Sequence, residues 1–494
     1  FELSRNLSLT GLVPKTSFTY PGYTLASIGS NTISGTIDSS ATGAGTGPGG
    51  NTTVIVSNNG TLTMSGRLNL VTGNTLVGSP SGMGNYAVTG VLSGNGALEK
   101  QGYGVLFLDP SDSSSFTGIL RLGSARDHNT VSPNWVDRGR NSVRVTKNFV
   151  IGTRETIESK SDQNDGLTLE VRMDNPLLQT TGSVNASIDN ARNPQPTLFV
   201  DHGVGSTVTG GTLALGTVTN SLNFASRNGY GVTVGPLVMN GIAGSSYANS
   251  LAGLLTITGS TTFPAAATTL AFSGDGNTLF AGNLTGSSAT VARSLSKAGA
   301  GLLTITSTAA TLSGNVAITG GGLALTDFRS VNNIATGTIS LGNATSLIIG
   351  TTEAPGAAAD LVSQRRINVA VGFSFGGAII ASQSGTDPVV LPNVVTSGGS
   401  GLLLLGGTST ADNRISSALG SLNPSDVSLK KAGPGTWVLS GSNTFTGPVW
   451  ITQGMLKLDA TAATSSVLTG STPIAFIDTR ANSGRQQSDF FINS

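Results

Sequence analysis

Residues 429–458 read LKKAGPGTWVLSGSNTFTGPVWITQGMLKL, and this stretch decides the fold. It alternates short apolar runs with turns built from Gly, Ser, Asn and Pro. Two glycines one residue apart, Gly433 and Gly435, let the backbone turn with positive φ and without a Cβ clash. The stretch therefore predicts a unit of strand, Gly turn, strand, polar loop, strand, Gly turn and strand.

The same pattern begins twice more along the chain, as LEKQGYGVLFL at residues 98–108 and as LSKAGAGLLTI at residues 295–305. All three copies share Lys-x-Gly-x-Gly followed by a four-residue strand. We expect the strands 105–108, 302–305 and 436–439 to occupy equivalent positions, each after a glycine turn. The residues that we assign to this repeat, all with a structural role, are Lys100, Gly102, Gly104, Lys297, Gly299, Gly301, Lys431, Gly433, Gly435, Asn443, Phe445 and Gly447.

A unit of three or four short strands cannot bury its own apolar face, so the copies must stack on one another. The turns between strands are too short for the helical crossovers of a βαβ sheet. The repeats favour a solenoid over a sandwich or a barrel. The sequence thus predicts an all-β fold, a β-solenoid whose backbone groups pair from one layer to the next.

Composition excludes several classes of protein. Charged residues make up 10% of the 494 residues, against roughly 25% in an average globular protein, and the net charge is +1. The low charge and the recurring apolar runs are the reverse of a disordered chain. A net charge near zero gives no electrostatic footprint for nucleic acid. The chain has no Cys for disulfides or thiolate sites, and no apolar run long enough for a transmembrane helix.

The three copies resemble the autotransporter-associated β-strand repeat, which occurs in passenger regions of bacterial autotransporter-like proteins. The copy at 429–458 carries most of the resemblance, including the Ser-Gly-Ser-Asn turn before Phe445-Thr-Gly447. The copy at 98 lacks the Gly-x-Asn turn, and the copy at 295 lacks the aromatic residue. The resemblance implies an irregular right-handed parallel β-helix with inserted loops, export to the bacterial cell surface, and no enzymatic activity.

The copies are unevenly spaced, which indicates diverged layers and inserted loops between them. Residues 121–176 concentrate charges of both signs, as expected of a solvated excursion or of a subunit contact. The predicted organisation is an N-terminal strand or cap with a Gly-rich segment at 1–50, solenoid at 51–120, a charged insertion at 121–176, solenoid at 177–472, and a C-terminal cap or contact segment at 473–494.

Catalytic and metal chemistry find little support. The two histidines, His128 and His202, each follow an Asp in a polar stretch, and no Gly-x-Ser-x-Gly elbow accompanies them. Two histidines cannot form a three-His zinc site. Carboxylates on neighbouring rungs could still meet, as in a β-helix enzyme acting on polysaccharides. We expect no catalytic, cofactor-binding or metal-binding residues, and rank this enzyme third.

The leading hypothesis is a non-enzymatic extracellular structural protein that self-associates into a bacterial surface filament, sheath or layer. The alternative is an autotransporter passenger adhesin whose partner is a cell-surface or polysaccharide target. Both termini carry apolar side chains, and strand addition from a second copy would cover their open edges. The candidate contact residues are Phe1, Leu3, Phe490 and Phe491. Equally, the two ends could fold back and cap their own solenoid.

Overall fold

The computed structural model describes the chain over part of its length. The described residues are 2–4, 7–8, 13–14, 25–38, 51–71, 74–78, 84–100, 105–122, 142–145, 156–161, 168–172, 177–179, 183–188, 197–202, 205–219, 221–239, 244–263, 268–285, 292–350, 358–370, 378–382, 385, 387–397, 401–420, 427–459, 474–476 and 488–493. The chain divides into an N-terminal unit, Phe1–Asn240 with Ser250–Leu255, and a C-terminal unit, Gly241–Asn249 with Thr256–Ser494.

In the N-terminal unit the chain visits three sheets in turn. The β1 sheet contains β1 (Glu2–Leu3), β5 (Asn31–Ile33), β8 (Thr61–Met64), β11 (Asn85–Val88), β14 (Val105–Leu108), β16 (Ser142–Val145), β18 (Thr168–Arg172), β21 (Thr197–Asp201) and β24 (Leu222–Ser226). The β7 sheet contains β3 (Val13–Pro14), β4 (Leu25–Ile28), β7 (Asn51–Asn58), β10 (Asn74–Gly78), β13 (Ala97–Lys100), β15 (Ile119–Leu122), β17 (Thr156–Ser161), β20 (Ser183–Ile188), β23 (Val218–Thr219) and β26 (Leu237–Val238). The third position holds β2 (Leu7–Ser8), β6 (Ile37–Asp38), β9 (Leu68–Leu70) and β12 (Leu92–Gly94), and separately β19 (Leu177–Gln179), β22 (Gly211–Leu215) and β25 (Tyr230–Val234).

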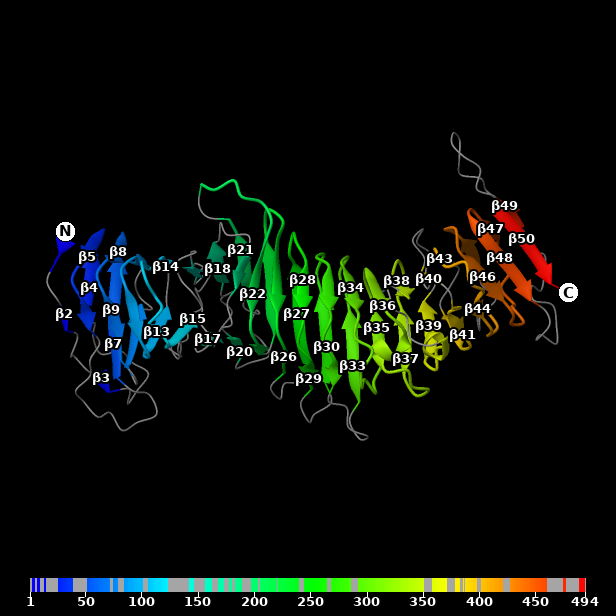
Figure 1. Ribbon diagram of the computed structural model, residues 1–494, viewed down its shortest axis with the longest axis horizontal. Helices are drawn as coiled ribbons and strands as arrows, with labels where there is room; N and C mark the ends of the chain where they lie inside the picture. Colours follow the sequence, from blue (N-terminus) through cyan, green and yellow to red (C-terminus); the bar gives the residue numbers. More distant parts are fainter. Residues whose placement is uncertain are drawn as a thin grey trace, which may run out of the picture. The chain divides into compact units, whose positions relative to one another are not determined.

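The C-terminal unit is built in the same way (Figure 1). Its β27 sheet contains β27 (Gly244–Ser250), β30 (Thr268–Ser273), β33 (Arg293–Lys297), β35 (Val316–Ile318), β37 (Thr338–Leu341), β39 (Arg366–Ala370) and β42 (Val394–Ser397). Its β28 sheet contains β28 (Leu255–Ile257), β31 (Thr278–Phe280), β34 (Leu302–Ile305), β36 (Gly322–Leu325), β38 (Ser346–Ile349), β40 (Ala378–Ser382), β43 (Gly401–Gly407), β45 (Val427–Lys431), β47 (Val449–Ile451) and β49 (Ile474–Phe476). The remaining strands are β29 (Thr261–Thr262) with β32 (Leu284–Thr285), and the β41 sheet of β41 (Val390–Leu391), β44 (Asn413–Ile415), β46 (Thr436–Leu439), β48 (Gly454–Asp459) and β50 (Ser488–Asn493).

Parallel pairing in register joins successive rungs of the solenoid. In the C-terminal unit Leu270 pairs with Leu295, Leu295 with Val316, and Val316 with Ile339, so one rung takes about 21 to 25 residues. These four side chains are at most 1% exposed and form one column of the apolar core. The residues between them along each strand face outward, because side chains of a strand alternate between its two faces. The predicted all-β parallel solenoid is confirmed.

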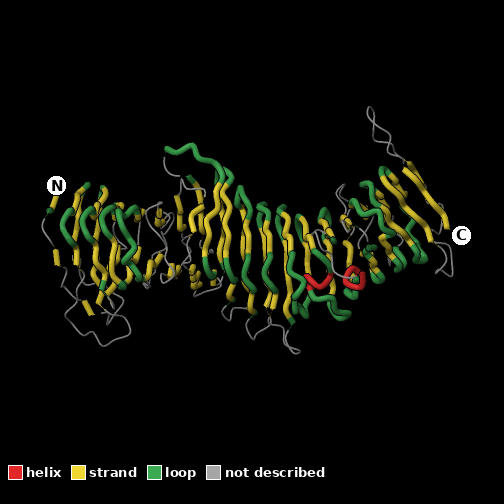
Figure 2. The backbone as a smooth tube through the Cα atoms, in the orientation of Figure 1, coloured by secondary structure: helices red, strands yellow, loops and turns green. Residues whose placement is uncertain are grey.

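Helix is almost absent from the described residues, as Figure 2 shows. Two short 3₁₀ helices, η1 (Phe328–Val331) and η2 (Ala358–Leu361), lie in the C-terminal unit. The Asp327 side chain caps η1 by accepting a hydrogen bond from the backbone N–H of Arg329 at 2.9 Å. No described helix has the length and apolar character that a membrane span requires.

The strands that lie in the segments singled out from the sequence take part in the ladders. Within 121–176, strand β16 pairs with β14 and β18, and β17 pairs with β15 and β20, all in parallel. Near the N-terminus β3 pairs with β7 and is antiparallel to it. The proposed segment boundaries stay predictions.

Candidate functional site

The sequence motif forms a buried corner, which we call the Lys–Gly corner and define by residues 297–301 and 431–435. Lys431 is the last residue of β45, and its side chain is fully buried between Leu405 and Ile451 in the register of the β28 sheet. Its Nζ donates hydrogen bonds to Ala432 O at 3.1 Å and to Gly433 O at 2.8 Å. A third bond reaches Gln453 O of the next rung at 3.1 Å. The lysine therefore ties its own corner to the following one.

Lys297 repeats this geometry. Its Nζ donates to Ala298 O at 2.6 Å, to Gly299 O at 2.9 Å and to Gly320 O of the next rung at 3.4 Å. In the N-terminal unit Lys100 is 1% exposed, and its Nζ lies 5.9 Å from the centre of the Tyr86 ring. The motif lysine is thus an inward-facing residue in all three copies.

Burial changes the acidity of these lysines. It lowers the pKa of Lys100 to about 7, and those of Lys297 and Lys431 to about 8. Three carbonyl oxygens nonetheless match the three N–H donors of each of the latter two ammonium groups. With at most 3% of each side chain exposed, none of the three amines is accessible to a substrate. The motif lysines therefore have a structural role.

The two glycines of the corner have different roles, which corrects the expectation that both adopt positive φ. Gly299 and Gly433 have φ of 72° and 75°. At Gly301 and Gly435 the backbone lies so close to the preceding rung that no residue with a Cβ fits. A Cβ would lie 2.1 Å from Gly276 O at the first position and 2.5 Å from Ser409 O at the second. Gly102 and Gly104 lie outside the described residues.

The polar loop of the third copy alternates, with Asn443 and Phe445 buried and Thr444 and Thr446 exposed. Asn443 is 0% exposed; its Oδ1 accepts from the N–H of Leu419 at 2.8 Å, and its Nδ2 donates to Gly441 O at 3.0 Å. Phe445 is 3% exposed, and a Cβ on Gly447 would lie 2.4 Å from Val427 O. These residues join adjacent rungs.

The two described corners, at 297–301 and 431–435, share this local path but not the sheet on which it lies. The strands that follow the corner are β14, β34 and β46, and they belong to the β1, β28 and β41 sheets, respectively. The expectation of equivalent positions thus holds for the strand after each turn and fails for the face of the solenoid. The local sequence determines the conformation of the corner. The number of residues between copies determines which two sheets that corner connects.

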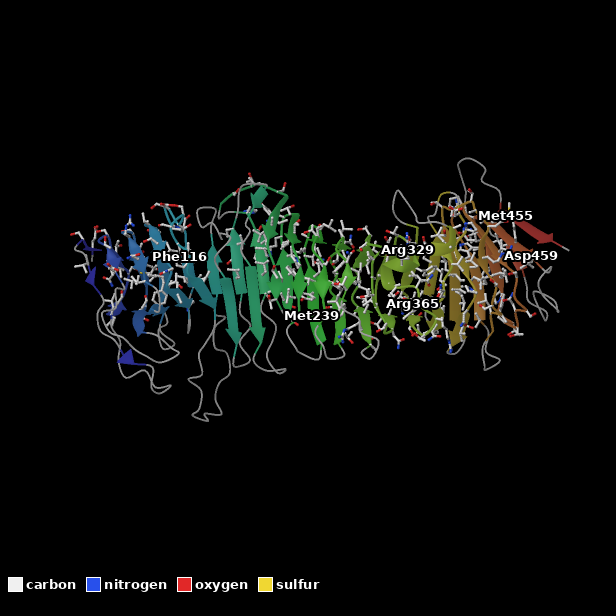
Figure 3. All side chains as sticks on the ribbon, turned by 60° about the horizontal axis from the view of Figure 1, so that its bottom comes forward. Phe116, Met239, Arg329, Arg365, Met455 and Asp459 are labelled. Atoms are coloured by element: carbon white, nitrogen blue, oxygen red, sulfur yellow. The ribbon has the colours of Figure 1, made fainter. Side chains whose placement is uncertain are left out.

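Sequence reasoning missed Arg365, which is fully buried and donates to four backbone carbonyls. The acceptors are Asn332 O at 2.7 Å, Gly314 O at 2.9 Å, Leu312 O at 2.8 Å and Val331 O at 2.7 Å. Burial lowers its pKa to about 10. Figure 3 labels Arg365 together with Arg329, whose guanidinium pairs with Asp327 at 2.7 Å beside η1. No local pattern marks Arg365 for burial, because its acceptors are backbone atoms 33 to 53 residues away.

Polar side chains also gather on the outer face of β18 and β21. Arg172 Nη1 lies 2.9 Å from Asp201 Oδ2, and its Nε donates to Glu170 Oε1 at 2.6 Å. Burial raises the pKa of Asp201, but hydrogen bonds from Asn228 and from the backbone N–H of His202, with nearby Arg172, outweigh it and leave the pKa lowered. Arg172 thus bridges two carboxylates on neighbouring rungs, but the lowered pKa of Asp201 is the opposite of what the general acid of a glycosidase needs.

Metal ligands do not gather among the described residues, where no group of three His, Cys, Asp or Glu side chains could hold an ion. His128 lies outside the described residues, and His202 adjoins Asp201 in the cluster above.

The candidate contact residues at the termini pair with their own chain where they are described. Leu3 of β1 pairs with Ile33 of β5, and Phe490 and Phe491 of β50 pair with Leu456 and Lys457 of β48. Phe1 lies outside the described residues. A role for these residues in contact with a second copy stays a prediction.

Comparison with known proteins supports the predicted resemblance. Residues 429–458 match the sequence model of the passenger-associated-transport-repeat family. A segment of 65 residues is 42% identical to the adhesin BmaC autotransporter of Brucella suis. That segment is 13% of this chain and 2% of the adhesin, so the chain spans a small part of that relative. No solved structure matches the chain.

Proposed function

We propose that this chain is part of an autotransporter passenger that acts outside the bacterial cell as a non-enzymatic adhesin. The observation that carries the proposal is the Lys–Gly corner, whose copy at 431–435 lies within the segment that matches the passenger-associated repeat and whose buried Lys431 joins two rungs. The similarity of one segment to an autotransporter adhesin supports the same function. In this proposal the solenoid is a scaffold, and its outer faces and loops contact the target.

Secretion or display on the bacterial surface follows from the same resemblance. The buried donors of the motif lysines are bound to backbone carbonyls, which favours a scaffold role for the motif over a catalytic one, since reacting groups would converge in an accessible cleft. Self-association into a filament, sheath or layer is a separate possibility that the proposal does not need. Sedimentation of the purified chain over a range of concentrations tests it.

Adhesion can be measured with the purified chain. Fluorescent beads coated with the folded chain should bind to host-cell monolayers, and soluble folded chain should compete for that binding. The matched control is the same chain unfolded in denaturant and coated at equal density. Binding no greater than that of the unfolded control would contradict the proposal.

A further inference from the structure

An outward-facing aromatic side chain lies at the centre of the polar cluster in the N-terminal unit. Phe199 is half-buried on β21, between Leu198 and Val200, which are at most 1% exposed and face the core. In the register of the β1 sheet Phe199 pairs with Glu170 on β18 and with Ala225 on β24. Its ring therefore lies on the outer surface, between two neighbouring rungs.

Two guanidinium groups flank this ring from the two neighbouring rungs. The Cζ atoms of Arg172 and of Arg227 each lie 5.8 Å from the ring centre, within the range of a cation–π interaction. Both arginines are thereby oriented by an apolar surface.

The two arginines differ in their partners. Arg172 is neutralised by Glu170 and Asp201, and also donates to His202 O at 3.1 Å. The second oxygen of Asp201 accepts from Asn228 Nδ2 at 2.7 Å. Arg227 is exposed and forms no ion pair with any residue in the described part of the chain. The acceptors of the cluster are engaged, whereas the donors of Arg227 face solvent.

These features define the ligand. A guanidinium without a carboxylate partner binds a carboxylate through paired N–H donors. The part of the half-buried Phe199 ring that the two guanidinium groups leave uncovered offers an apolar surface for the C–H groups of a pyranose ring. Sugar hydroxyls would meet the polar side chains beside the ring. We propose that Phe199 and Arg227 form a subsite for a carboxylated saccharide, such as a sialic acid or a hexuronic acid.

The subsite deepens the proposed adhesin function and rests on it for its biological meaning. Binding is measured by isothermal titration calorimetry on the full chain, with sialyllactose and a glucuronic acid trisaccharide as probes. Lactose is the neutral control, and hexaglutamate tests for an acidic peptide. We expect at least one acidic saccharide to bind and lactose not to. R227Q and F199T should each weaken binding about tenfold or more, which is about 1.4 kcal/mol.

The matched control is R67Q, which removes an exposed arginine elsewhere in the same unit and should leave affinity unchanged. Far-UV circular dichroism and the melting temperature check that each variant is folded. No binding of either acidic saccharide, or equal binding of hexaglutamate, would overturn the proposal. If coated beads still adhere to cells while the chain binds neither saccharide, the subsite is wrong and the adhesin function stands.

Discussion

Replacing Lys431 by Met is expected to lower the free energy of unfolding by about 1.5 to 6 kcal/mol. The change keeps the aliphatic stem in the core and removes the ammonium group from three backbone carbonyls. Three charge-assisted hydrogen bonds contribute roughly 4.5 to 9 kcal/mol at about 1.5 to 3 each. Against this, the fall in pKa from 10.5 to about 8 corresponds to a burial cost of roughly 3 kcal/mol.

The chain offers a control at the neighbouring position. Lys430 precedes Lys431 on β45, faces outward and is half-buried. K430M should change stability by less than about 0.5 kcal/mol. Urea unfolding of both variants, followed by far-UV circular dichroism at pH 7, gives the comparison. If the two variants unfold at the same urea concentration, the corner lysine does not join rungs and the reasoning is wrong.

Three further outcomes follow from the same contacts. Lysines in the unfolded chain keep their proton up to a pKa near 10.5, whereas the buried motif lysines release it near pH 7 to 8, so the unfolded chain binds more protons between these values. The free energy of unfolding measured in urea should therefore rise from about pH 8 to pH 10.5. Replacing the three lysines by Met should flatten that rise. R365M should lower the free energy of unfolding by about 3 to 5 kcal/mol, because it leaves buried carbonyls unpaired. The control is R366M, which replaces the neighbouring exposed arginine at the start of β39. G435A should lower the melting temperature by several degrees because its Cβ would meet Ser409 O at 2.5 Å, whereas G385A, with no atom within 4 Å, should not.

Much of the fold could be predicted from the sequence because the repeat carries its own geometry. The Lys-x-Gly-x-Gly pattern located each corner, and apolar alternation located the strands around it. The pattern could not tell which sheet each copy joins, since that depends on the total length of the rungs in between. The strands after Gly301 and Gly435 lie in different sheets for this reason.

Other features depend on contacts that no local pattern encodes. Arg365 is buried and donates hydrogen bonds to backbone carbonyls of two earlier rungs. From sequence alone, an isolated arginine is expected to be exposed. The cluster around Asp201 forms because three rungs place their outward residues in register. The sequence allowed carboxylates on neighbouring rungs to meet, but it did not indicate that Arg172 would lie between them.

The ladder of parallel rungs can be tested directly because the chain contains no Cys, so any introduced pair of cysteines is labelled cleanly. Ala271, Ser296, Ala317, Ser340, Asn368 and Val395 form one outward register row in the C-terminal unit. At about 4.8 Å per rung, Cα atoms should be about 19 Å apart for residues 271 and 368, and about 24 Å for 271 and 395.

Pulsed electron paramagnetic resonance on the spin-labelled pairs A271C/N368C and A271C/V395C measures both separations. A stacked solenoid should give narrow distance distributions near these two values, with the second distance longer by one rung. Distances that do not increase with the number of rungs, or broad distributions in a folded protein, would contradict the stacked solenoid.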